Sequence, residues 1–187
     1  MAKEELAQLL AAHPVIAAVR DVNDMELAIH SPVKAIFLMC GDIMNIKDIV
    51  DQAKRNGKAI FLHIDLLRGI GSDQQGLEYL AKCVRPDGIV TTKNHLIKIA
   101  KKLDMYAIQQ VFLIDTQAFN KSIQNIRMNK PDAIELMPAL MPRVISEIVA
   151  ETDAPVVAGG LVHHKEEITN ALEAGAISVA VGQNLLW

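Results

Sequence analysis

Short apolar runs alternate with amphipathic segments along the whole chain. Eight runs rich in Val and Ile have the length of strands, and the segments between them repeat apolar residues every three or four positions, as helices do. The predicted strands are residues 15–20, 34–39, 59–65, 88–92, 106–110, 133–137, 155–158 and 177–181. Strict alternation of strand and helix predicts a parallel sheet with helices outside it.

The spacing of these units favours one architecture. About 23 residues separate the start of one strand from the next, close to the minimum for a strand, a crossover helix and two short loops. Each intervening helix has one apolar stripe to bury; the clearest are Ile46-Ile49-Val50-Ala53, Leu96-Ile99-Ala100-Leu103, Phe119-Ile123-Ile126 and Ile168-Ala171-Leu172. Eight such units favour a (β/α)₈ barrel, and an open doubly wound sheet is the alternative.

The length predicts a reduced barrel. The chain has 187 residues, fewer than the roughly 250 typical of this fold, and only residues 182–187 follow the last strand. We therefore expect a minimal TIM-type α/β barrel whose last helix is missing or very short. Residues 4–12 predict an extra N-terminal helix, with Leu6, Leu9 and Leu10 on one side, to cover the barrel wall near that gap. No linker interrupts the pattern, so residues 1–187 are expected to form a single domain.

Composition limits the class of protein. The residues are 51% hydrophobic but only 4% aromatic, so the core is aliphatic. Cys40 and Cys83 are far apart in apolar surroundings and are expected to be reduced core residues. No apolar run reaches the ~18 residues that span a bilayer, and acidic residues near the start are unlike a signal peptide. We expect a cytoplasmic protein without membrane contact.

Polar side chains are expected to converge where the predicted strands end, which is where ligands bind in such barrels. Alternation along residues 60–65 points His63 and Asp65 inward, and the same argument places Glu135 inside. The candidate polar ligand contacts are Arg20, His63, Asp65, Gln110 and Glu135. Buried charges are costly unless they pair with each other or with a ligand. An Arg–Glu or Arg–Asp plug, or a hydrogen-bonded core role for His63, remains open.

Two glycine turns follow the seventh and eighth strands. Glycine lets the backbone approach an anion, so Gly159, Gly160, Gly182 and Gln183 are candidate phosphate-binding residues. Neither turn contains Lys or Arg, so backbone amides and Arg20 would have to interact with the negative charge of the phosphate. The alternative is that these glycines serve only as turn residues.

Catalytic machinery is less evident than a pocket. The strand lysines, Lys34 and Lys58, lie at amino ends, and His163 and His164 lack an obvious third metal-binding partner. We therefore predict no catalytic residue, no metal and no cofactor, and expect a regulatory protein in preference to an enzyme. Asp65 with Glu135 still allows an acid–base pair in an isomerase or lyase acting on a small phosphorylated metabolite.

Charge is unevenly distributed along the chain. The formal net charge is −3, yet residues 88–131 hold seven basic and two acidic residues, which is +5 and leaves −8 elsewhere. We expect their two neighbouring helices to form a positive surface that fits RNA, although a solvated helix face is the plainer reading. The candidate RNA-binding residues are Lys93, Lys98, Lys101, Lys102, Lys121 and Arg127.

Several sequence blocks together resemble the glycerol-3-phosphate responsive antiterminator family, the regulators of glycerol uptake operons. They are FLHIDL at 61–66 with GI at 69–70, GIVTT at 88–92, YAIQQ at 106–110, FLIDT at 112–116, KPDAIE at 130–135, AGG at 158–160 and ALEAGA at 171–176. The chain departs from the family pattern at Gln110, where arginine is expected, at Ala139, where glycine is usual, and in the turn Gly182-Gln183.

The resemblance implies a regulator rather than an enzyme. It implies a barrel that binds glycerol 3-phosphate and, in that state, leader mRNA, so that transcription does not terminate early. A homodimer is possible. A metabolite-binding protein that has lost its affinity for RNA is a further alternative.

Overall fold

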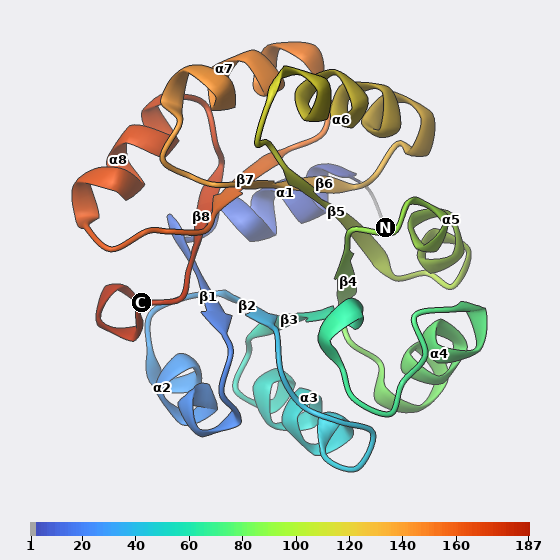
Figure 1. Cartoon of the computed structure of the whole chain (residues 1–187). Helices are drawn as coiled ribbons and strands as arrows, with labels where there is room; N and C mark the ends of the chain where they lie inside the picture. The colour runs from blue at the N-terminus through green and yellow to red at the C-terminus, as the bar shows by residue number, and fades with distance from the viewer. Residues whose placement is uncertain (1–2) are drawn as a thin grey trace.

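The computed structural model describes residues 3–187 and forms a closed barrel of eight parallel strands in chain order (Figure 1). Closure is made by β1 and β8, with Val15 opposite Val179 and Ala17 opposite Val181. The strands are β1 (Val15–Val19), β2 (Ala35–Leu38), β3 (Ala59–His63), β4 (Gly88–Thr91), β5 (Tyr106–Phe112), β6 (Ala133–Met137), β7 (Val156–Gly159) and β8 (Ser178–Val181). The predicted TIM-type barrel is confirmed, and the open-sheet alternative is wrong.

Strand ends differ from the predictions at two places that matter for the site. β3 ends at His63, and a 3₁₀ turn, η2 (Ile64–Leu66), then carries Asp65. β5 continues to Phe112 because its last two residues still pair with β6, Phe112 lying opposite Met137. Gln110 is therefore inside the strand and not at its end.

Helices cover the outside of the barrel. They are α2 (Met25–His30), α3 (Ile46–Arg55), α4 (Gln74–Tyr79) continued by the π-helix η3 (Leu80–Val84), α5 (Asn94–Lys102), α6 (Thr116–Asn129), α7 (Pro142–Glu151) and α8 (Lys165–Glu173), with a 3₁₀ turn, η1 (Val22–Asp24), before α2. After β8 only the 3₁₀ turn η4 (Asn184–Leu186) follows, as the short C-terminal segment predicts.

Alternate strand residues divide between two hydrophobic clusters. Ile60 and Leu62 pack outward against the helices, while Phe61 points inward, where its ring meets that of Phe37 edge to face at 5.6 Å. Glu135 likewise lies inside between outward-facing Ile134 and Leu136. The predicted orientations of β3 and β6 are confirmed, since the residue that follows each outward one must face the interior.

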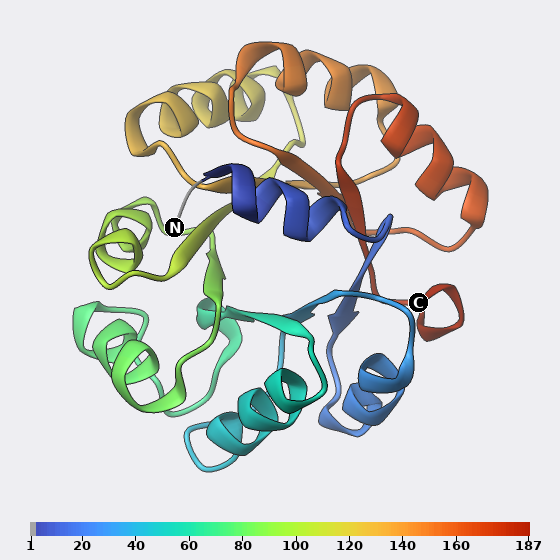
Figure 2. The same ribbon diagram turned by 180° about the vertical axis from the view of Figure 1, so that it is seen from behind.

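The N-terminal helix α1 (Lys3–Ala11) exists, but its expected position on the wall is wrong. Leu6 and Leu10 are fully buried and belong to the cluster inside the barrel, so α1 lies across the amino-terminal opening (Figure 2). The gap left by the missing helix is partly filled by the C-terminus itself: Trp187 packs on the outer cluster, and its indole N–H donates to the Val181 carbonyl at 2.7 Å. At the amino-terminal end, Leu6 and Leu10 cover the apolar barrel interior, and the burial of these two side chains explains the position of α1.

The two cysteines are free, but only one fits the predicted core position. Cys40 is half-buried and packs against the outer cluster, whereas Cys83 is exposed on η3. The prediction for Cys83 is wrong because η3 buries Leu80 and Val84 and turns Cys83 to water. Within residues 3–187, no helix is both long and apolar enough to cross a membrane.

Candidate functional site at the mouth of the barrel

Two adjoining hollows occupy the carboxyl-terminal mouth and share Arg20, Met39 and Met137. The first, of about 290 Å³, is otherwise lined by Ala18, Gly160, Leu161, Val162, His163, Ala180, Gly182 and Gln183. The second, of about 460 Å³, is otherwise lined by His63, Asp65, Leu66, Thr92, Gln110 and Phe112. The mouth is where this fold places its ligands, and these volumes suit a small metabolite.

The first hollow brings the two predicted glycine turns together. Gly160 directly follows β7, Gly182 directly follows β8, and both line this hollow together with Gln183. Gly160 has φ +82°, a conformation that favours glycine. Arg20 is exposed at the end of β1 and has no ion pair within the described part of the chain. The hollow therefore combines a free guanidinium with a backbone surface that an anion can approach.

Gly159 lies elsewhere than predicted. It is the last residue of β7, buried and facing the barrel interior instead of lining the first hollow. A Cβ at this position would lie 3.1 Å from Oε1 of Glu135. Its lack of a side chain leaves space over that carboxyl group.

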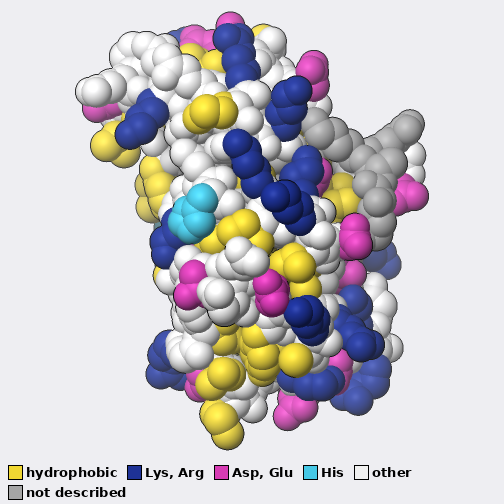
Figure 3. All heavy atoms as spheres, turned by 90° about the vertical axis from the view of Figure 1, so that its right-hand side faces the viewer, with side chains coloured by type: hydrophobic (Ala, Val, Ile, Leu, Met, Phe, Trp, Pro, Cys, Tyr) yellow, Lys and Arg dark blue, Asp and Glu magenta, His cyan; other side chains and the backbone are white. Residues whose placement is uncertain are grey.

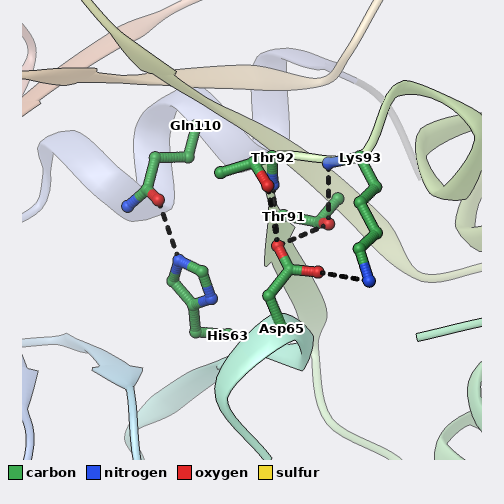
Figure 4. Close-up of polar contacts among 6 residues, drawn as sticks. All are labelled: His63, Asp65, Thr91, Thr92, Lys93 and Gln110. Carbon is green, nitrogen blue, oxygen red and sulfur yellow. Dashed lines mark hydrogen bonds and ion pairs between the residues drawn. The ribbon is translucent and has the colours of Figure 1, made fainter. Parts of the chain in front are cut away.

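A chain of buried polar groups links β3, β5 and β6. The Nε2–H of His63 donates to Oε1 of Gln110 at 3.0 Å, because an amide oxygen only accepts (Figure 4). The amide nitrogen of Gln110 donates to Oε2 of Glu135 at 2.7 Å and contacts Sδ of Met137 at 3.6 Å. Nδ1 of His63 and Oε1 of Glu135 are buried without a hydrogen-bond partner. The amide N–H groups of Gln110 therefore already have partners inside the protein, whereas Nδ1 of His63 and Oε1 of Glu135 have no donor.

The carboxyl group of Glu135 has no exposed surface. Burial raises its pKa to about 7, and the hydrogen bond from Gln110 and the charge of Arg20 offset this only in part. Among the side chains of residues 5–187, no cation lies within ion-pair distance of it.

Asp65 has the opposite environment. Its Oδ2 accepts from the Thr91 hydroxyl at 3.0 Å and from the Thr92 backbone N–H at 2.9 Å, and Oδ1 lies 3.6 Å from Nζ of Lys93 (Figure 4). Burial raises the pKa of this carboxyl group, but the hydrogen bonds from Thr92 and Thr91 outweigh it and hold the pKa below its usual range. Lys93 consequently lies at the mouth and not on the outer helix surface where the sequence places it.

Some mouth residues were absent from the predicted set: Met39, Thr91, Thr92, Phe112 and Met137. All five lie at or just after the carboxyl ends of strands. Extending the carboxyl-end rule to every inward position would have found Met39, Thr92, Phe112 and Met137. Thr91 would still have been missed, because Val90 before it points inward and Thr91 therefore does not.

Comparison with known proteins identifies the family to which the chain belongs. The family model described as "Glycerol-3-phosphate responsive antiterminator" matches residues 15–187. The chain belongs to this antiterminator family. The family assignment and the fold that the sequence predicts are thereby confirmed, and the family supports a regulatory role.

Three relatives of this antiterminator-family chain illustrate the likeness. The uncharacterized protein YgcP of Escherichia coli strain K12 is 34% identical over 182 residues, covering 97% of this chain and 95% of that protein. The crystal structure of the glycerol uptake operon antiterminator regulatory protein from Listeria monocytogenes has a TM-score of 0.90 at 32% identity, with 94% and 95% of the two chains covered. A glycerol uptake operon antiterminator-related protein from Thermotoga maritima has a TM-score of 0.82 at 28% identity, with coverage of 92% and 96%.

The basic surface of this antiterminator-family chain is smaller than the sequence count implies. Asp132 pairs with Lys101 at 3.0 Å, and Glu151 pairs with Arg127 at 2.5 Å. These acids and Asp65 come from outside residues 88–131, so the local charge of +5 falls to +2.

The remaining predicted RNA-binding residues, Lys98, Lys102 and Lys121, are exposed and have no ion pair within the described residues. They lie on α5 and α6, which pack side by side. Figure 3 shows the side of the barrel that carries α4 and α5, where Lys and Arg side chains predominate with scattered acidic ones. We call Lys98, Lys102 and Lys121 the basic face.

His163 and His164 lie at the start of α8. Their backbone N–H groups both donate to Glu167, at 2.7 and 2.9 Å, which holds the start of α8. The described residues contain no group of three or more His, Cys, Asp or Glu side chains that could hold a metal ion.

Proposed function

We propose that this protein is a cytoplasmic transcription antiterminator that binds glycerol 3-phosphate, or a similar small phosphorylated polyol, and the leader mRNA of a glycerol uptake or utilisation operon. The observation that carries the proposal is the unpaired guanidinium of Arg20 in a hollow where two glycine turns meet. An anion in this hollow would contact both the charged guanidinium group of Arg20 and the backbone of the two glycine turns.

The ligand would lie across both hollows, since they share Arg20. Its phosphate would lie against Gly160, Gly182 and Gln183, and its hydroxyl groups would extend toward the buried polar groups His63, Asp65, Gln110 and Glu135. The contact assigned to Gly159 would be indirect, because that residue shapes the space over Glu135.

The RNA would contact the basic face. Contacts from unpaired lysines to phosphates are sequence-independent and salt-dependent. The loops around the mouth offer a poorer surface for RNA, because they hold several acids, among them Asp21, Asp24 and Asp42.

Calorimetric titration with glycerol 3-phosphate tests the ligand assignment. We expect saturable heat with the wild-type protein and affinity at least about tenfold weaker in Arg20→Gln, since a charge-assisted hydrogen bond contributes about 1.5–3 kcal/mol. The matched control is Arg143→Gln, whose guanidinium pairs with Glu147 on α7. Absence of heat at millimolar ligand would refute the proposal, and leader-RNA binding measured with and without the ligand tests its regulatory half.

A second candidate function, an isomerase or lyase acting on a small phosphorylated metabolite, rests on the opposite pKa shifts of Asp65 and Glu135. Two carboxyl groups whose pKa values are shifted in opposite directions can act separately, one as the base and the other as the acid. Turnover of a small sugar phosphate that is abolished by Asp65→Asn would favour this candidate over the regulator.

A further inference from the structure

Glu135 is the most unusual polar group of the mouth, because one of its two carboxyl oxygens has no hydrogen-bond partner. Oε2 accepts one hydrogen bond from Gln110, and Oε1 has no partner although the side chain is completely buried. A buried acceptor without a donor destabilises the folded state, so native proteins rarely keep one without a reason. An acceptor of this kind beside a ligand cavity indicates that a donor arrives from the ligand.

Met137 separates Glu135 from the cavity. Its side chain is 9% exposed, lies over the Glu135 carboxyl on the same face of β6, and borders both hollows. Its tip lies against Gly159, the last residue of β7, and Gly160, which follows it: Cε is 3.5 Å from where a Cβ of Gly159 would be, and Sδ is 3.6 Å from that of Gly160. Methionine is unbranched and adaptable, so this is a cover that a small ligand can displace.

We propose that the Met137 side chain is a movable cover over a second subsite, and that Oε1 of Glu135, in the charged form of the carboxyl group, accepts a hydrogen bond there from a ligand hydroxyl group. The inference rests on the proposed function, because Arg20 and the glycine turns take the phosphate of the same ligand. Gly159 is the specificity-determining residue, since only a residue without a side chain leaves Oε1 within reach. The ligand class is a short phosphomonoester with a hydroxyl group remote from the phosphate.

The subsite predicts strong discrimination between ligands of similar size. A site built to hydrogen-bond a hydroxyl group rejects an analogue without it, because the buried acceptor then stays unpaired. We expect glycerol 3-phosphate to bind the wild-type protein about 100-fold more tightly than propyl phosphate, which has the same chain length and phosphate but no hydroxyl. Calorimetric titration of both compounds gives this ratio directly.

Two variants test the assignment to Glu135. Glu135→Leu removes the acceptor from a site that already has apolar neighbours, and Gly159→Ala places a methyl group 3.1 Å from Oε1 at a backbone position outside the left-handed region. In both, we expect the ratio to fall by at least about tenfold, because the hydrogen bond to Oε1 is lost, while the affinity for propyl phosphate stays unchanged. Leu27→Ala, at an exposed position of α2 that lines neither hollow, is the control that retains the ratio. Thermal unfolding confirms that each variant is folded.

The outcomes separate the two proposals. A wild-type protein that binds neither compound would overturn the proposed function. A wild-type protein that binds both equally, or variants that keep the 100-fold ratio, would overturn the subsite and leave phosphate binding intact. Met137→Ala adds a further check: we expect the ratio to persist, because the cover and not the acceptor has been removed.

Discussion

At the residue scale, the mouth contains two carboxyl groups whose environments differ. Asp65 accepts hydrogen bonds from Thr91 and Thr92, which favour its charged form, and its pKa is lowered. Glu135 has a single amide donor and no access to water, which favours its neutral form. At neutral pH, Asp65 is therefore a charged anchor for the start of α5, while Glu135 lies close to its titration midpoint.

The pKa of Glu135 predicts a pH dependence of stability. Its folded-state pKa of about 7 lies above the ordinary value of 4.5. The folded state therefore binds the proton more tightly, and this stabilisation is complete below the unfolded pKa and lost as pH rises through 7. We expect the free energy of unfolding of the wild type, relative to Glu135→Gln, to fall by about 3 kcal/mol between pH 4 and pH 8.

Urea unfolding over that pH range measures the difference. Glu147→Gln, at an exposed carboxylate of α7, should follow the wild-type pH curve. Parallel curves for the wild type and Glu135→Gln would contradict a buried, protonated carboxyl group.

At the scale of elements, the two ends of the barrel have separate tasks. α1 closes the amino-terminal end with Leu6 and Leu10, and the strand ends at the opposite side form the mouth. Between them lies a layer of inward apolar residues that includes Phe37 and Phe61. Stability at one end is therefore separable from ligand binding at the other.

Leu6→Ala tests this separation. Truncation of a fully buried leucine costs about 2–5 kcal/mol, so we expect a loss of that size in the free energy of unfolding by urea. The affinity for glycerol 3-phosphate should stay within about twofold, because no atom of the mouth is changed. Leu9→Ala, at a half-buried position of the same helix, should cost less. A large change in ligand affinity by Leu6→Ala would show that the ends are coupled.

At the scale of the whole molecule, charge distribution decides where a polyanion can bind. Ion pairs with Asp65, Asp132 and Glu151 neutralise part of the positive region, which leaves the basic face of α5 and α6. The helices α5 and α6 contain no acidic residue of their own. An RNA that follows this face would meet side chains free to bind phosphates.

The basic face predicts a salt effect. We expect the triple variant Lys98→Gln, Lys102→Gln and Lys121→Gln to bind leader RNA more weakly, with the slope of log affinity against log salt reduced by about 0.7–0.9 for each phosphate that lysine no longer neutralises. Arg127→Gln and Lys101→Gln, whose side chains are already paired, should change the slope less. Filter binding over a range of salt measures both, and an unchanged slope in the triple variant would remove this face from the RNA interface.

The sequence by itself determined the barrel, because the spacing of apolar residues decides locally which way each side chain points. In the strands a spacing of two places Phe61 and Glu135 inside, and in the helices a spacing of three or four gives each helix one face to bury. It also determined that Arg20, His63, Asp65 and Gln110 would share one end, since parallel strands end together.

Only the tertiary structure decided which of these groups are free. Gln110 uses its donors on Glu135 and Met137, Lys93 turns to Asp65, and Gln109 is buried on the opposite face of β5, where it bonds Asn94 at 2.9 Å. These partners are separated by 15 to 28 residues along the chain. Local periodicity determines which way a side chain points, but not which group from another element meets it there.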